Sequence, residues 1–486
     1  MALIPHPRHF VAIVDIVLGC LRACEPIHLV LAGLLAAGLA TVQLMKRRRT
    51  VYLVDYACFQ GIGSCRMPRA TFIEHIHLNP LFDEHSVSFM TRMLESSAIG
   101  EETRLPAGDL YMPAQNSFQE ARAEAELVVF SAIDDLFAKT VVTADAIDIL
   151  VVNCSVFAPV PSISDMIVNR YKLRDDVRAV NLSGMGCSAG VISAGLAAGL
   201  LQATGHGATQ HALVVSTEII TCNFYTGKER PMQLSNVLFR VGGAAVLLST
   251  SEDRARFRLS HLVRTSTTGT HDGSYSCVFQ EEDGEGNLGV NLSKDLLAVA
   301  GNALKANIRA VAPLVLPLSE QLLFAMSFVA RKLGLTVKPH VPGFRKAFDH
   351  FCVHCGGRAV IDKVQSSLGL SDEQVEASRM TLHRFGNTSS STVWYELAYI
   401  EAKGRMRKND TVWMIAFGSG FKCNSAIWEC IRPADQPDRA WAGRLGQSLK
   451  GRRPSRLLSS PHPAAVITVN FSHGKRSLKA HCGGLG

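Results

Sequence analysis

The chain has 486 residues, of which 50 are basic and 42 are acidic, so its formal net charge is +8. Hydrophobic residues make up 47% of the chain and charged residues 19%, a balance that excludes a disordered or coiled-coil protein and allows a large buried core. All of the excess charge lies at the end, because residues 441–486 contain eight Lys and Arg and no Asp or Glu. Residues 1–440 are therefore neutral, which argues against a nucleic-acid-binding body.

The N-terminus predicts a membrane anchor over residues 1–50. Ile27–Met45 is a run of 19 residues without Asp, Glu, Lys or Arg, and at ~1.5 Å per residue it can cross a hydrocarbon core of roughly 30 Å. Four basic residues, 46–49, follow directly and favour a cytosolic position for that end. The alternative is a cleaved signal peptide formed by the earlier apolar run Phe10–Leu21. The 13 cysteines, an odd number without framework spacing, favour a reducing, cytosol-facing environment for the body.

The body alternates strand-like and helix-like segments. Residues 51–140 are mixed and mostly polar, with helical periodicity over 82–100. Five β-branched, apolar runs then predict strands, at residues 146–155, 211–219, 242–250, 348–357 and 411–421. Helices are expected over Ser188–Gln202, Arg358–Ser367 and Val393–Lys403. The alternation predicts an α/β fold with buried strands. The pattern also looks doubled, because "ILVVNCS" and "FCVHCGG" each end an apolar strand with a thiol or imidazole.

A further apolar stretch runs from Val311 to Gly334. It contains Pro313, Pro317 and Glu320, which make a membrane-spanning helix costly. The remaining interpretations are an amphipathic segment that lies on a membrane, one that lines an acyl pocket, and a buried core helix.

The segment "NLSGMGCSAGVISAGLAAGLL", residues 181–201, predicts a tight turn from a strand into a helix. Glycines at 184 and 186 permit the turn, and Cys187 lies at the start of the helix. The helix dipole and the free amides at that end are expected to lower the pKa of the thiol and to stabilise an oxyanion. The alternative is a small buried cysteine in a tightly packed helix.

Two further motifs supply potential partners for this cysteine. "HFCVHCGG" places His350 and His354 four residues apart, and "LHRFGNTSSS" does the same for His383 and Asn387. Cysteine, histidine and asparagine recur in enzymes that acylate a thiol. The His and Cys residues of the first motif also suit zinc, but the compact CxxC pairs of structural zinc sites are missing.

Five motifs in order, "VNLSGMGCSAG", "STEIITCNFYTGKERPMQLSNVLFRVGGAAVLLS", "HFCVHCGGRAVID", "LHRFGNTSSSTVWYELAYIEAKGRM" and "FGSGFKCNSAIW", resemble the plant 3-ketoacyl-CoA synthases over about residues 51–440. The resemblance implies the thiolase fold, a duplicated five-layer αβαβα body that works as a homodimer. It further implies anchoring in the endoplasmic reticulum membrane with the catalytic domain facing the cytosol. On this basis we expect an anchor over 1–50, a first half over 51–340, a second half over 341–440 and a basic, disordered tail over 441–486.

The resemblance assigns the catalytic residues by motif. The nucleophile falls on Cys187, the catalytic histidine on His354 and the asparagine on Asn387. His350 and His383 match two further family histidines, interpreted either as residues that orient this pair or as packed structural histidines. One position departs from the family pattern: a histidine usually follows "LVRT", where this chain has Ser266 and a later His271.

The predicted reaction is a decarboxylative condensation of malonyl-CoA with a long-chain acyl-CoA, the first step of very-long-chain fatty acid elongation. It proceeds through a Cys187 thioester and requires no metal or redox cofactor. Expected partners are the two CoA substrates, the membrane, a second copy of the chain and other elongation enzymes, with no nucleic acid. Two alternatives remain: a type III polyketide synthase-like enzyme, and a catalytically silent paralogue that acts as a dimer partner.

Overall fold

The body is built on one long sheet, in the strand order β3-β2-β4-β5-β1-β6-β11-β10-β9. The structure is a computed structural model, and it describes residues 33–34, 49–204, 207–271, 273–334, 336–337, 343–344 and 347–442. Its strands are β1 (Tyr52–Cys58), β2 (Ile147–Asn153), β3 (Arg178–Leu182), β4 (His211–Thr217), β5 (Gly243–Ser249), β6 (Phe257–Ser266), β9 (His350–Val353), β10 (Thr411–Gly418) and β11 (Lys422–Cys430). A separate hairpin pairs β7 (Val278–Glu282) with β8 (Leu288–Leu292).

The helices are α3 (Arg69–Leu78), α4 (Glu84–Ser96), α5 (Phe118–Lys139), α6 (Ile163–Tyr171), α7 (Ala189–Ala203), α8 (Arg230–Leu238), α9 (Leu296–Val315), α10 (Leu318–Lys332), α11 (Arg358–Leu368), α12 (Glu376–Phe385) and α13 (Thr392–Ala402). The strands and helices predicted after residue 140 are confirmed, with boundaries within a few residues of those expected. The helical periodicity over 82–100 corresponds to α4.

The predicted duplication is visible in the pairing of the strands. β2 runs parallel to β4, which pairs antiparallel with β5 and then β1. β9 likewise runs parallel to β10, which pairs antiparallel with β11 and then β6. The strands that end in "ILVVNCS" and "FCVHCGG" therefore occupy equivalent places in the two halves. β6 pairs along its length with β11, so the boundary between the halves falls between β5 and β6. β6 and α9 therefore belong to the second half, although they precede the boundary expected at residue 340.

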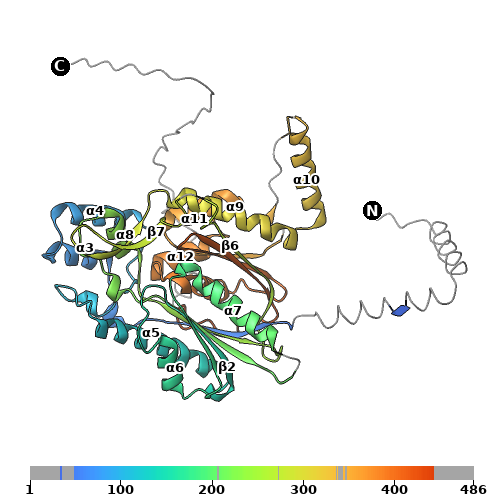
Figure 1. Cartoon of the computed structure of the whole chain (residues 1–486), viewed down its shortest axis with the longest axis horizontal. Coiled ribbons are helices and arrows are strands. Elements are labelled where there is room, and N and C mark those ends of the chain that lie inside the picture. The colour runs from blue at the N-terminus through green and yellow to red at the C-terminus, as the bar shows by residue number, and fades with distance from the viewer. Residues whose placement is uncertain are drawn as a thin grey trace, which may run out of the picture. The chain divides into compact units, whose positions relative to one another are not determined.

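The two halves of the sheet enclose a central helical layer, as Figure 1 shows. α7 contacts β2 and β4 on one side and β10 and β11 on the other, and α13 lies between β9 and β1. α5 and α6 cover the outer face of the first half, and α9 covers that of the second, with α11 packed against α9. This arrangement is the predicted five-layer αβαβα order.

Small residues let α7 fit between the sheets. A Cβ added at Gly195 would lie 2.8 Å from the Leu262 side chain of β6, and one added at Gly190 would lie 2.2 Å from the carbonyl oxygen of Ser390. Within the described ranges, Gly186–Ala203 is the one helical stretch long and apolar enough to cross a membrane. Because it is mostly buried between the sheets, it is a core helix.

Two predicted segments fall largely outside the described residues. The expected anchor at Ile27–Met45 is described only at residues 33–34, and the expected tail only at Trp441 and Ala442. Trp441 is 2% exposed, donates its indole N–H to the Tyr395 carbonyl at 2.8 Å and packs on Phe385. The folded body therefore includes the first residue of the predicted tail.

Candidate active site

Cys187 lies on the turn between β3 and α7, as the glycine pattern predicts. Gly184 and Gly186 adopt φ values of +66° and +67°, a region in which residues with a Cβ are strained. The Gly186 amide donates to the Ser155 hydroxyl at 2.8 Å, which ties the turn to the end of β2. A Cβ added at Gly186 would lie 2.5 Å from the Ser419 nitrogen, so the turn between β10 and β11 packs directly on this backbone. Glycine is required here for both reasons.

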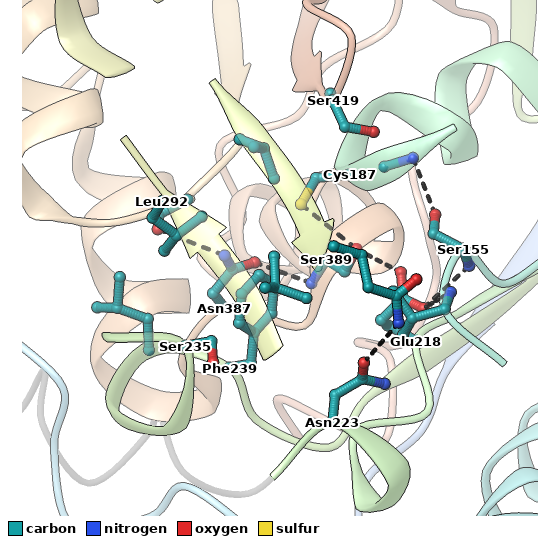
Figure 2. A pocket seen from close by; sticks show the side chains of 18 of the residues that line it. Ser155, Cys187, Glu218, Asn223, Ser235, Phe239, Leu292, Asn387, Ser389 and Ser419 are labelled. Carbon is teal, nitrogen blue, oxygen red and sulfur yellow. Dashed lines mark hydrogen bonds between the residues drawn. The ribbon is translucent and has the colours of Figure 1, made fainter. Parts of the chain in front are cut away.

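Cys187, His354 and Asn387 line one cavity of about 440 Å³. Figure 2 shows Cys187 and Asn387 within this pocket, with Ser389 between them. Both halves of the fold contribute to the wall of the cavity. Gly418 and Ser419 come from the end of β10 and the turn after it, and Ser155 comes from the end of β2. Much of the remaining lining is apolar and comes from α8, α9 and the β7–β8 hairpin, including Leu234, Leu238, Val278, Val290, Leu292 and Leu296.

His354 directly follows β9 and is 3% exposed. Its amide donates to the Ile415 carbonyl at 2.9 Å, and its Nδ1 lies 2.6 Å from the hydroxyl of Thr392 at the start of α13. Burial lowers the pKa of His354 to about 4, so the imidazole is neutral at pH 7. The Thr392 hydroxyl also lies 3.0 Å from the Ser389 carbonyl, to which it can donate. Because a hydroxyl carries one proton, the direction in which Thr392 donates sets the tautomer of His354.

Asn387 is held by main-chain contacts on both sides. Its backbone pairs with Leu238 and Arg240 at the end of α8. Its side-chain Oδ1 accepts from the Ser389 amide at 2.9 Å, and its Nδ2 donates to the Gly356 carbonyl at 3.3 Å. These contacts fix which end of the amide is the donor and leave the second Nδ2 proton available to the cavity.

A buried carboxylate connected to Cys187 was not predicted. The Ser389 hydroxyl lies 3.4 Å from Cys187 Sγ and 3.2 Å from Glu218 Oε2. Glu218 Oε1 accepts from the amides of Ser155 and Val156 at 2.9 and 3.0 Å, after β2. Burial raises the pKa of Glu218, and these hydrogen bonds act in the opposite direction. In the sequence, its position at the end of the β4 run was the available signal.

The expected lowering of the thiol pKa is wrong for this arrangement. Burial raises the pKa of Cys187 to about 12; the Ser389 hydrogen bond opposes this shift and the charge of Glu218 adds to it. The reason is that Cys187 lines a largely apolar cavity, in which a thiolate is poorly solvated. The resting pair at this site is therefore a neutral thiol and a neutral imidazole.

The other two predicted histidines do not line the cavity. His350 Nε2 lies 2.8 Å from Asp410 Oδ2 beside β9, and His383 Nδ1 lies 3.2 Å from the Ala98 carbonyl at the surface. The residue that contacts the His354 ring is Thr392. In the departing loop, the Ser266 hydroxyl pairs with Thr268 at 2.9 Å, and Thr268 lines the cavity while Ser266 and His271 do not. Across the described part of the chain, no three His, Cys, Asp or Glu side chains gather as a metal site requires.

Comparison with known proteins identifies the family. The model of the family described as FAE1/type III polyketide synthase-like protein matches residues 43–333, and that of the 3-oxoacyl-[acyl-carrier-protein] synthase III C terminal matches residues 345–430. 3-Ketoacyl-CoA synthase 5 of Arabidopsis thaliana is 54% identical over 86% of this chain and 85% of its own length. 3-Ketoacyl-CoA synthase 6 of the same plant is 55% identical over 83% of this chain and 82% of its own. The chain belongs to the 3-ketoacyl-CoA synthase family.

Solved structures extend the likeness beyond the family. The C-terminal type III polyketide synthase domain of Steely1 from Dictyostelium has a TM-score of 0.62 at 17% identity, over 79% of this chain and 99% of that one. CsyB complexed with CoA-SH has a TM-score of 0.62 at 20% identity, over 78% of this chain and 100% of that one. These comparisons establish that the family member described here has the thiolase-like fold.

Proposed function

We propose that this member of the family is a 3-ketoacyl-CoA synthase that condenses malonyl-CoA with a long-chain acyl-CoA by way of a Cys187 thioester. The observation that carries the proposal is the convergence of Cys187, His354 and Asn387 on one largely apolar cavity. It unites a thiol, an imidazole and a carboxamide from separate parts of the chain. These are the groups needed to hold an acyl chain and to stabilise an enolate.

Acyl transfer is the first step. The Cys187 sulfur attacks the thioester carbonyl, its proton leaves to a base or to water, and CoA departs as the thiol after taking up a proton. The raised pKa of Cys187 means that proton loss accompanies attack and does not precede it. The amides of Cys187 and Ser419 are suited to stabilise the tetrahedral oxyanion, since the latter packs against the Gly186 turn.

Decarboxylation and condensation follow. The malonyl carboxylate leaves as CO2, and its bonding electrons pass to the thioester enolate, whose oxygen accepts from Asn387 Nδ2. When Thr392 donates to His354 Nδ1, the imidazole carries its proton at Nε2 and becomes the second donor. The enolate carbon then attacks the Cys187 thioester, the sulfur leaves, and a 3-ketoacyl-CoA two carbons longer is released.

The cavity wall suits an acyl chain, because each buried CH2 contributes roughly 0.8 kcal/mol. A type III polyketide synthase-like activity is the alternative, and the shared fold supports it. A second alternative is a catalytically silent paralogue that acts as a dimer partner.

We also propose that the enzyme resides in the endoplasmic reticulum membrane with its catalytic body in the cytosol, as a homodimer associated with other elongation enzymes. The support for the membrane is the 19-residue uncharged run Ile27–Met45 with its basic flank. Such an anchor suits a substrate that partitions into lipid.

The test is expression in microsomes with labelled malonyl-CoA and a series of acyl-CoA primers, for the wild-type chain and Cys187→Ala. We expect 3-ketoacyl products one condensation longer than the primer, absent in the variant. Multiply extended products would favour the polyketide alternative. No product from either chain would favour the silent paralogue, and equal product from both would refute the role of Cys187.

A further inference from the structure

α10 presents an apolar face to its surroundings. Figure 1 shows the helix standing away from the layered body, joined to the end of α9. Five apolar residues at spacings of four, four, three and four lie along one side of it: Leu318, Leu322, Met326, Val329 and Leu333. Their exposed fractions run from 53% at Val329 to 74% at Leu333. Leu314, Leu323 and Phe324 are also exposed. We call this surface the α10 face.

On the side of α10 opposite this stripe, the helix contacts the protein at Glu320. Among the residues of the helix whose burial is described, only Glu320 is buried, at 5% exposure. Its carboxylate accepts from the Gly343 amide at 3.3 Å. The neighbouring Gln321 donates to the Leu316 carbonyl at 2.8 Å. A surface helix of a water-soluble protein has the opposite orientation, with its apolar side on the core. These contacts hold the α10 face outward. The interpretation as a buried core helix is therefore wrong for α10, whereas Val311 and Leu316, earlier in the stretch, belong to the core.

Exposed cationic side chains lie in the last turn of α10 and on the preceding helix, α9. Lys305 and Arg309 on α9 and Arg331 and Lys332 in the last turn of α10 are all exposed. The sequence of the two helices contains one acidic residue, the buried Glu320. An apolar stripe with basic residues at its end is the composition of helices that lie in the plane of an anionic membrane surface.

The acyl substrate of this chain's own cavity is not the occupant, because α9 contributes only its start to the cavity lining and α10 contributes no residue. A second copy of the chain would bring the same cationic residues together. A lipid surface satisfies both the apolar stripe and the positive charge.

We propose that α10 docks in the interfacial layer of an anionic bilayer, as a contact separate from the N-terminal anchor. The apolar stripe is buried among the acyl chains, and the basic last turn of α10 meets lipid phosphates. α9 connects this contact to the site, since Leu296 and Ala300 at its start line the cavity and its far end carries α10. The proposal concerns a surface and does not depend on the condensation reaction.

Site-specific photocrosslinking of the full chain tests the proposal. A benzophenone amino acid replaces Leu322 in one variant and Val141, 67% exposed beyond α5 in the opposite outer layer, in the other. Both are reconstituted in nanodiscs that contain anionic phospholipid and irradiated. We expect phospholipid adducts at position 322 and at least tenfold fewer at position 141.

Other products at position 322 would overturn the proposal. A crosslink to a second copy of the chain would make the α10 face a dimer interface. A crosslink to another protein would make it a docking site for that protein. Equal lipid labelling at both positions, or labelling at neither, would show that the face has no preference for lipid. The readout requires no turnover, so an inactive chain would leave this result valid.

A paired variant checks that the apolar stripe causes the docking. With the probe moved to Leu318, Met326→Glu and Val329→Glu together should lower lipid labelling about tenfold or more. Met326→Leu with Val329→Ile keeps the face apolar and should leave the labelling unchanged. Both pairs lie on exposed positions and preserve the contacts of Glu320. Undiminished labelling in the acidic pair would refute the proposal.

Discussion

Replacement of Glu218 by Gln should lower the pKa of the Cys187 thiol. Cys187 Sγ and Glu218 Oε2 lie 3.4 and 3.2 Å from the same Ser389 hydroxyl, so they are less than about 7 Å apart. At that separation, two unit charges in an effective dielectric of about 20 repel by roughly 2.5 kcal/mol. Loss of the carboxylate charge therefore lowers the thiol pKa by about two units. Gln keeps an oxygen that accepts from the amides of Ser155 and Val156, so the turn after β2 is retained.

The assay is inactivation by iodoacetamide between pH 6 and pH 10, with mass spectrometry of the Cys187 peptide. A thiol with a pKa of about 12 is thiolate to the extent of only about 10⁻⁵ at pH 7. The wild-type rate should therefore rise about tenfold per pH unit and reach no plateau below about pH 10. The curve for Glu218→Gln should run parallel, displaced toward lower pH by about two units.

Glu124→Gln is the matched control. Glu124 is also buried and also accepts from two consecutive amides, those of Ile220 and Thr221. It does not contact Ser389, so its variant should follow the wild-type curve. A wild-type plateau below pH 8 would show a preformed thiolate and refute the reasoning. Coincident wild-type and Glu218→Gln curves would show that the carboxylate does not act on the thiol.

Substitutions at three positions of the site, two of them with a control variant, test the geometry. Gly186→Ala places a Cβ 2.5 Å from the turn after β10, on a backbone with positive φ, so it should lower activity at least about 100-fold. Gly199→Ala is the control: its Cβ enters open space on α7, so the variant should keep its activity and gain about 1 kcal/mol of unfolding free energy. Thr392→Val removes the hydrogen-bond partner of His354 and should lower kcat more than it raises KM, with recovery in Thr392→Ser. Asn387→Asp should slow release of CO2 from malonyl-CoA about 100-fold or more and leave acylation by acyl-CoA nearly intact, so an unchanged CO2 rate would contradict its role.

The strands and the nucleophile turn could be predicted because their signals are local. β2, β4 and β10 are buried on both faces and read as continuous apolar runs. β6 was missed because it alternates exposed and buried positions and lies beside a long loop. The turn at Cys187 was predictable because glycine favours the positive φ values found at residues 184 and 186.

The contacts around the thiol could not be predicted, because each joins distant segments. Ser389 and Glu218 are separated by 171 residues, and their contact depends on how the two halves of the sheet close on α7. The pKa of Cys187 was predicted with the wrong sign for the same reason. A helix start lowers a thiol pKa in water, but the sequence does not reveal how far the cavity excludes water.

Mass spectrometry of the acylated chain tests the central claim most directly. The wild-type protein is incubated with a long-chain acyl-CoA and no malonyl-CoA, digested, and searched for an acyl thioester. We expect one acyl group per chain on the Cys187 peptide, with an equal amount of CoA released, and discharge of that group when malonyl-CoA is added. An acyl group on another residue, or condensation without any acylated Cys187, would contradict it.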